Sequence, residues 1–211
     1  MRFGGRSTAD DKRCFFWCCV ALERDCVRDG IADGFRPVGP NGRRQLRAAA
    51  SCVPTYVPTT LPAGYWQIGR IWRLRAAGRL SCAVTTPGTA RFDLRLGGAV
   101  AFDTLAMPLN VVAKTNVPWH LEAILTCRAV GSGTSANLIG QGHWMSEASI
   151  LTALPATGPG PGGQLVPYNT APVVGTGFNS QSALTLDFFF TQTVATGSMT
   201  LHTFMIEQMT P

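Results

Sequence analysis

The chain has 211 residues, of which 45% are hydrophobic and 14% are charged, and its formal net charge is +6. This composition excludes a disordered polypeptide and supplies enough apolar side chains for one complete hydrophobic core. The longest apolar run, around Phe15–Leu22, is far shorter than the roughly 20 residues of a membrane-spanning helix, so we expect no membrane partner.

The composition divides the chain into two parts near Cys52. Residues 1–52 contain ten of the 18 basic residues, six of the 12 acidic residues and five of the seven cysteines. We therefore predict an N-terminal arm over residues 1–59 and a single domain over residues 60–211. A basic arm is typical of nucleic-acid binding, but acidic residues are interspersed with the basic ones here. This mixture favours a solvated segment, and we do not expect nucleic acid as a partner.

The cysteines of the arm do not follow a metal-binding pattern. The spacing from Cys14 through Cys18 and Cys19 to Cys26 differs from the paired C-x2-C of zinc sites, and this segment contains no histidine. We expect reduced thiols, no metal ion and no cofactor. The apolar run in the same segment is too short for a secretion signal and is not followed by a cleavage site.

Residues 11–28 form the stretch with the clearest helical periodicity. Phe15, Cys19, Leu22 and Cys26 recur on one stripe of a helix. A short helix of this kind is stable only when its apolar stripe is buried, so we predict that these four residues bind a partner. Residues 30–62, rich in proline and glycine, predict an extended linker.

From residue 60 onward the apolar pattern changes to a period of two, which predicts strands. The most regular alternation lies in residues 90–96, where arginine and aspartate occupy every second position. Similar alternation predicts strands at 72–76, 119–129, 184–190 and 198–209, and weaker patterns predict strands at 99–104, 109–114, 137–146 and 164–174.

Because no helix separates the predicted strands, they must pair in antiparallel fashion. One apolar face on each strand indicates two sheets packed face to face. We therefore predict an all-β fold, an antiparallel β-sandwich of jelly-roll type. The residues expected between the sheets are Phe92, Leu94, Trp119, Leu121, Leu125, Leu184, Leu186 and Phe188.

Few residues in the sequence are suited to catalysis. His120 and His202 lie on the polar sides of predicted strands, and His143 with Glu147 is the one pair that suggests metal binding or proton transfer. The chain has no G-x-S-x-G, no H-E-x-x-H, no phosphate loop and no dinucleotide fingerprint. We predict that the protein is not an enzyme and that it acts through its surfaces.

Arginine is the preferred basic residue, with 16 of the 18 basic positions. Its planar guanidinium pairs with carboxylates and is enriched at protein interfaces. Four arginines occupy polar positions of two predicted strands: Arg73 and Arg75 on one, Arg91 and Arg95 on the other. One interpretation is a partner-binding patch on one sheet face, and Phe189 on a polar side favours a subunit contact. The alternative is a solvated face paired with Asp93 and Asp103.

Turn and strand motifs follow one another in a characteristic order over residues 60–209. They are Arg73-Leu74-Arg75-Ala76-Ala77-Gly78, Thr86-Pro87-Gly88-Thr89, Leu96-Gly97-Gly98, Pro118-Trp119 and Val130-Gly131. This order resembles a group of virion structural proteins of tailed phages. The resemblance implies a jelly roll that forms a homotrimer on the capsid surface. As a cement or decoration protein, it would bind the major capsid protein or other virion proteins, with assembly in the host cytoplasm.

Two alternatives stay open. Residues 1–52 have no counterpart in the resemblance, so they are either an arm that holds neighbouring capsid subunits or an over-extended start before Val53. The domain is alternatively a receptor- or glycan-binding part of a fibre or spike. In that case its candidate aromatic residues are Tyr65, Trp66, Trp144 and Tyr168.

Overall fold

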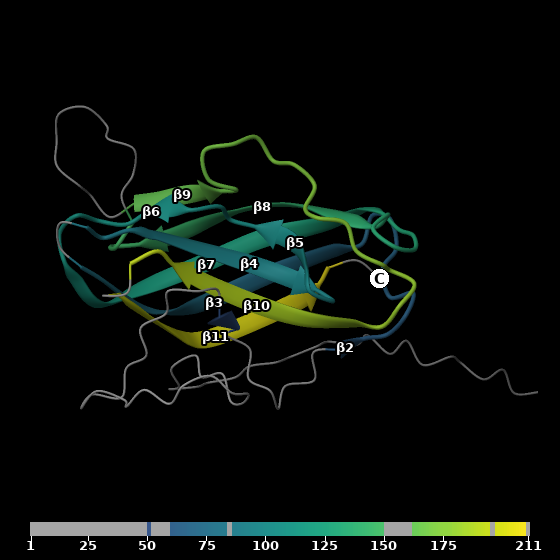
Figure 1. Cartoon of the computed structure of the whole chain (residues 1–211), viewed down its shortest axis with the longest axis horizontal. Coiled ribbons are helices and arrows are strands. Elements are labelled where there is room, and N and C mark those ends of the chain that lie inside the picture. Colours follow the sequence, from purple (N-terminus) through teal and green to yellow (C-terminus); the bar gives the residue numbers. More distant parts are fainter. Residues whose placement is uncertain (1–49, 52–59, 84–85, 150–161, 195–196, 210–211) are drawn as a thin grey trace, which may run out of the picture.

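The computed structural model describes residues 50–51, 60–83, 86–149, 162–194 and 197–209. These residues form strands, turns and loops, without any helix (Figure 1). Accordingly, the described part of the chain contains no helix that could span a membrane. The predicted helix at 11–28, with its stripe of Phe15, Cys19, Leu22 and Cys26, lies outside the described residues.

Five strands form the first sheet, in the order β11-β3-β7-β8-β9, and every neighbouring pair is antiparallel. We refer to it as the five-stranded sheet. Its strands are β3 (Ile71–Cys82), β7 (Lys114–Ala129), β8 (Asn137–Ser146), β9 (Gly162–Val166) and β11 (Ser198–Gln208).

The second sheet has six strands, and four of them follow the order β1-β10-β4-β5. The two others are short: β2 pairs with β10, and β6 pairs with β4. The strands are β1 (Ala50–Ser51), β2 (Thr60–Leu61), β4 (Thr89–Leu96), β5 (Ala99–Asp103), β6 (Met107–Pro108) and β10 (Leu184–Gln192).

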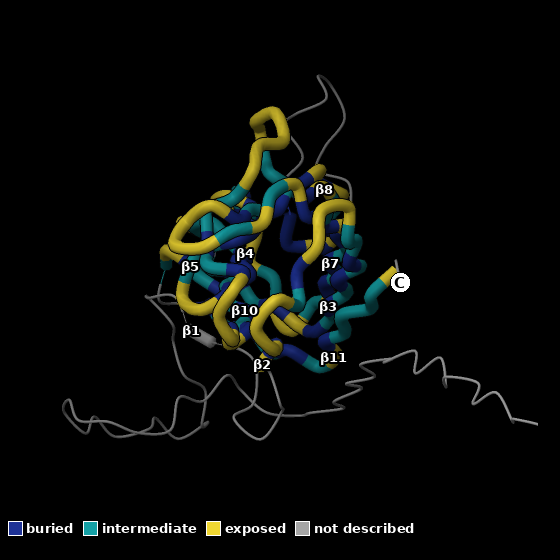
Figure 2. The backbone as a smooth tube through the Cα atoms, turned by 90° about the vertical axis from the view of Figure 1, so that its right-hand side faces the viewer, coloured by how far each residue is buried: buried dark blue, intermediate teal, exposed yellow. Residues whose placement is uncertain are grey.

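The two sheets lie against each other as two layers (Figure 1). The pairing is nested: β3, the first long strand, pairs with the last strand, β11, and β4 pairs with the second to last, β10. The two packed antiparallel sheets confirm the predicted all-β fold and β-sandwich, and the jelly-roll type stays a prediction. Figure 2 shows the resulting burial: buried residues recur along the strands, and the exposed residues gather in the connecting loops.

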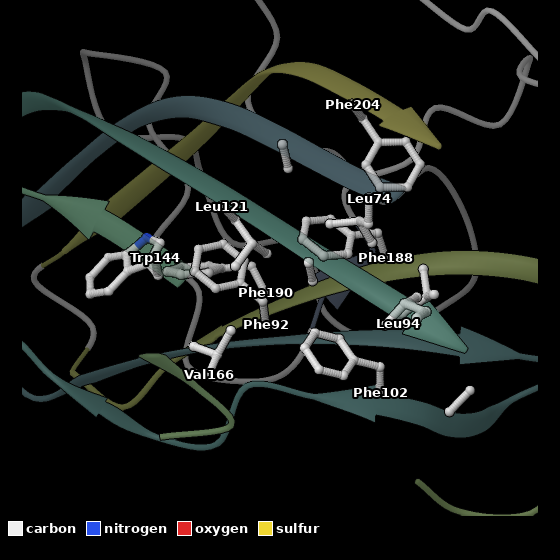
Figure 3. Packing of buried hydrophobic residues seen from close by; sticks show 14 of the residues in the cluster. Leu74, Phe92, Leu94, Phe102, Leu121, Trp144, Val166, Phe188, Phe190 and Phe204 are labelled. Atoms are coloured by element: carbon white, nitrogen blue, oxygen red, sulfur yellow. The ribbon is translucent and has the colours of Figure 1, made fainter. Parts of the chain in front are cut away.

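The core is built around Phe92, which is 1% exposed. Its ring centroid lies 4.9 Å from that of Trp119, 5.3 Å from that of Phe190 and 5.7 Å from that of Phe188, so both sheets contribute to one aromatic cluster. Figure 3 shows Phe92 among Phe188, Phe190 and Trp144. All eight residues predicted to lie between the sheets are buried, from Leu94 at 0% to Leu186 at 8% exposed. Strict alternation along β4, β7 and β10 is sufficient to predict this set.

Two predicted strands are wrong in part. Residues 109–113 do not form a strand, because the side-chain Oδ1 of Asn110 accepts the backbone N–H of Val112 at 2.9 Å and bends the chain there. Of the predicted range only Lys114 belongs to a strand, as the first residue of β7. The strand predicted over 164–174 ends at Val166, where Pro167 follows and provides no N–H for a sheet. Residues 167–173 form a loop instead.

Candidate interaction surfaces

The four arginines singled out in the sequence do not share a face. Arg73 and Arg75 lie on β3 of the five-stranded sheet, whereas Arg91 and Arg95 lie on β4 of the other sheet. All four point away from the core, so the two pairs lie on opposite sides of the sandwich. The predicted single arginine patch is therefore wrong, because alternation along a strand shows which side is polar but not which sheet holds the strand.

On the six-stranded sheet both arginines are paired with carboxylates. Arg91 donates from Nε to Asp103 at 2.8 Å and from Nη2 to the other oxygen at 2.5 Å, and this hydrogen bonding raises the pKa of Arg91. Arg95 donates from Nε to Asp93 at 2.6 Å, and its guanidinium carbon lies 3.7 Å from the ring centroid of Phe189. The pairing with Asp93 and Asp103 is confirmed, and Phe189 is covered by an arginine.

On the five-stranded sheet, Glu122 of β7 is the common partner of two arginines. Arg75 donates from Nε to Glu122 at 3.0 Å, and Arg73 lies 3.6 Å from Glu122 and 3.7 Å from Glu207. These side chains form a continuous line of opposite charges across β7, β3 and β11. The charges on this part of the face therefore neutralise one another.

Apolar side chains are exposed next to these ion pairs, on the same outer face. Ile124 of β7 is 36% exposed, Met145 of β8 is 47% exposed and Leu165 of β9 is 80% exposed. Residues on one face of neighbouring strands stand side by side, and Leu165 lies directly opposite His143 in the register. An apolar area flanked by neutralised charges is typical of a protein contact. We call this area, made of Ile124, Met145, Leu165 and the ion pairs of Glu122, the outer β face.

His120 and His143 also lie on the outer β face, with ring centroids 6.0 Å apart. Burial lowers the pKa of His120, and the neighbouring His143 lowers it further. The structure shows the His143 ring beside His120. Among the described residues, no group of three or more His, Cys, Asp or Glu side chains is placed to hold a metal ion.

A concave site lies on another side of the sandwich, between strands β4 and β5 and the loop of residues 167–176. Its volume is about 300 Å3, and Val100, Phe102, Leu105 and the Arg91–Asp103 pair are among its walls. Leu105 adopts a φ of 61°, a conformation that is costly for a leucine. Its N–H is held by Asp103 Oδ1 at 2.8 Å. The sequence did not indicate this site, because its weak alternation predicted a strand over 164–174, where the chain forms a loop after Val166.

Both cysteines among the described residues are buried and unbridged, at Cys82 and Cys127. Burial raises the pKa of both thiols. A thiol of raised pKa is a poor nucleophile and metal ligand, so these two residues contribute packing.

The aromatic residues considered for glycan binding are engaged inside the fold. Trp66 and Trp144 are 3% and 0% exposed. The hydroxyl of Tyr65 donates to Gln208 at 2.6 Å and accepts from Trp72 at 2.9 Å. Tyr168 packs against the core. These four side chains therefore do not form an exposed platform on which a sugar ring would stack.

Comparison with known proteins identifies no relative of this chain. No protein-family model matches the chain, no curated protein matches its sequence, and no solved structure matches its fold. The similarity of its turn and strand motifs to phage virion proteins therefore stays a prediction.

Proposed function

We propose that this protein is a structural protein of a tailed-phage virion, a decoration protein that forms trimers and stabilises the head by binding the major capsid protein. The order of turn and strand motifs suggests this class, and a rigid β-sandwich suits it. The observation that carries the proposal is the outer β face, where Leu165, Met145 and Ile124 are exposed beside neutralised charges.

The outer β face would make the contact with the shell. It lies on five hydrogen-bonded strands, so little conformational entropy is lost when a partner covers it. A partner that covers this face does not bury an unpaired charge, because Arg73 and Arg75 already form ion pairs with Glu122. Removing the exposed apolar surface of Leu165 from water supplies a driving force of about 25 cal/mol per Å2.

Three copies bind more tightly than one copy by avidity. When the first copy of a trimer attaches, the others are held near equivalent sites at a high effective concentration. Weak contacts on each outer β face then suffice for a stable attachment. The arm of residues 1–59 would add a further contact through the stripe of Phe15, Cys19, Leu22 and Cys26.

The experiment is an attachment assay with empty heads assembled from the major capsid protein of the encoding phage. The full chain is expected to co-sediment with these heads, and Leu165→Asp is expected to lower the affinity by about tenfold, because a carboxylate would be buried without a partner. Ile68→Asp is the matched control, since Ile68 is 70% exposed and lies outside the outer β face. Equal attachment of both variants would contradict the role of this face, and no attachment of the full chain would contradict the proposed function.

A further inference from the structure

Two of the three histidines of the chain lie side by side on the outer β face. Strands β7 and β8 are neighbours in the five-stranded sheet (Figure 1). His120 of β7 stands opposite Met145, and His143 of β8 stands opposite Glu122, so the two histidines are diagonal neighbours. Diagonal neighbours on paired strands are ordinarily about 7–8 Å apart. The ring centroids of His120 and His143 are 6.0 Å apart, so the two rings lean toward each other.

This separation allows both imidazoles to bind one metal ion. A ligating histidine nitrogen lies about 2.0–2.1 Å from a zinc ion, which places the centre of the ring about 3.2 Å from the metal. Two imidazoles on one ion therefore have centroids at most about 6.4 Å apart, and about 5.2 Å apart at a tetrahedral angle. The observed 6.0 Å lies between these two values, so both rings can reach one ion with a small rotation of the side chains.

One nitrogen of the pair has a free lone pair. The Nδ1 atom of His120 is buried, and in the part of the chain that the structure describes it has no hydrogen-bond partner. A buried side-chain nitrogen is normally hydrogen-bonded, so this atom is an unfilled binding position. The rings of His120 and His143 are tilted by 39°, which is not a flat stack. A metal ion would satisfy the open nitrogen, since neutral imidazole is a common metal ligand.

A hollow beside His120 gives an ion access from solvent. Its volume is about 320 Å3, which corresponds to roughly ten water molecules in the liquid. His120, Met145 and Glu147 are among its walls. Glu147 is exposed, and its carboxylate brings a negative charge to the wall that attracts a cation. A hydrated ion can therefore approach the histidine pair without any change in the backbone.

The histidine pair forms an open site, in which the protein supplies two ligands. Glu122 stands opposite His143, but its carboxylate accepts from Arg75 at 3.0 Å and lies 3.6 Å from Arg73. It is therefore already engaged, in line with the absence of a three-ligand group among the described residues. Water fills the other positions of the ion. Imidazole nitrogen suits copper, nickel and zinc, whereas magnesium and calcium prefer oxygen ligands.

We infer that His120 and His143 together bind one divalent transition-metal ion, which joins β7 to β8 on the outer β face. Among the common divalent ions, Cu2+ should bind most tightly, in keeping with the general order of affinities for nitrogen ligands. The inference is argued from these side chains and the hollow beside them. It goes beyond the proposed function and does not depend on it.

The experiment compares three histidine variants of the full chain. His120→Gln and His143→Gln each remove one ligand. His202→Gln is the matched control, because it removes the third histidine, which lies on β11 at the other edge of the same sheet. Accessible thiols are alkylated in all samples, since cysteine thiolates also bind these ions. Circular dichroism of each variant shows that its sandwich is intact.

The measurements are calorimetric titration with Cu2+ and electron paramagnetic resonance of the bound ion. The parent and His202→Gln are expected to bind one Cu2+ through two imidazole nitrogens. His120→Gln and His143→Gln are each expected to bind at least about tenfold more weakly, because the second imidazole of the pair acts at a high effective concentration. Zn2+ should compete for this site, and an excess of Mg2+ should not.

Three results would overturn the inference. The first is that either His120→Gln or His143→Gln binds Cu2+ as tightly as the parent. The second is that His202→Gln loses as much affinity as the other two variants. The third is that the Cu2+ bound to the parent is coordinated by a single nitrogen.

Discussion

His120 of β7 and His143 of β8 are diagonal neighbours on adjacent strands, with their ring centroids 6.0 Å apart. Glu122, on the same face, favours the charged form of His120, but burial, His143 and Arg75 disfavour it, and its pKa is lowered. His120 therefore links the outer β face to pH in the range in which histidine titrates.

We predict that the protein loses stability as the pH falls below about 6.5, the pKa of an unfolded histidine. In that range the unfolded chain binds a proton at His120 before the folded chain does, so acid favours unfolding. The free energy of unfolding, measured with urea at about pH 7.5 and pH 5.5, should fall less in His120→Gln than in the parent. If the free energy of unfolding falls between the two pH values by the same amount in His120→Gln as in the parent, His120 is not the group responsible.

A second prediction concerns the close approach of β7 and β8 at Gly142. A Cβ atom there would lie 2.0 Å from the carbonyl oxygen of Glu122, so Gly142→Ala should force the strands apart. We expect a loss of about 2–3 kcal/mol of stability. Gly163→Ala on β9 is the control, because its Cβ would lie 3.3 Å from the flexible Met145 side chain. Comparable stability of the two variants would mean that β7 and β8 are further apart at Gly142 than the structure shows.

The ion pair of Arg95 and Asp93 should matter more than the pair of Arg73 and Glu207. Asp93 is 2% exposed and Glu207 is 40% exposed as side chains. Arg95→Met leaves a buried carboxylate without its partner and is expected to cost about 2–3 kcal/mol, reduced by the partial exposure of the arginine. Arg73→Met should cost less than about 1 kcal/mol.

Chemical denaturation of both arginine variants checks this order. Asp93→Asn combined with Arg95→Met should cost less than the sum of the single changes, since the double variant buries no unpaired charge. Equal losses for Arg95→Met and Arg73→Met would speak against a buried pair on the six-stranded sheet.

A fourth prediction separates the arm from the sandwich. Among the residues that the structure describes, the buried core begins at Leu61, so a chain that starts at residue 50 should fold and associate like the full chain. It keeps β1, whose Ala50 and Ser51 pair with Phe190 and Phe189, whereas a start at Val53 would remove that strand. Attachment to empty heads should weaken, and undiminished attachment would show that residues 1–49 are not an anchor.

The sequence was sufficient to predict the sandwich because period-two alternation directly reports which side of a strand is buried. It correctly indicated that Phe92, Leu125 and Phe188 are buried between the sheets. It did not show that β3 and β4 belong to different sheets, because pairings such as Trp72 with Leu125 join residues far apart in the chain. These long-range pairings place the two arginine pairs on different sheets, so the sequence alone could not show whether they form one patch.

Local side-chain chemistry explains the other differences. Val111 and Val112 have high strand propensity, yet the bond between the Asn110 side chain and the N–H of Val112 produces a bend. The outer β face combines residues of β3, β7, β8 and β9, and the concave site combines β4, β5 and a loop. Neither surface has a contiguous pattern in the sequence, so both become visible only in the folded chain.

The most direct test of the proposed function is quantitative mass spectrometry of purified virions of the encoding phage. We predict that the protein is present in a copy number comparable with that of the major capsid protein, as expected for a subunit that decorates the whole head. A few copies per particle would contradict the decoration role and indicate a fibre or spike component instead. Complete absence from purified particles would contradict a structural role in the virion.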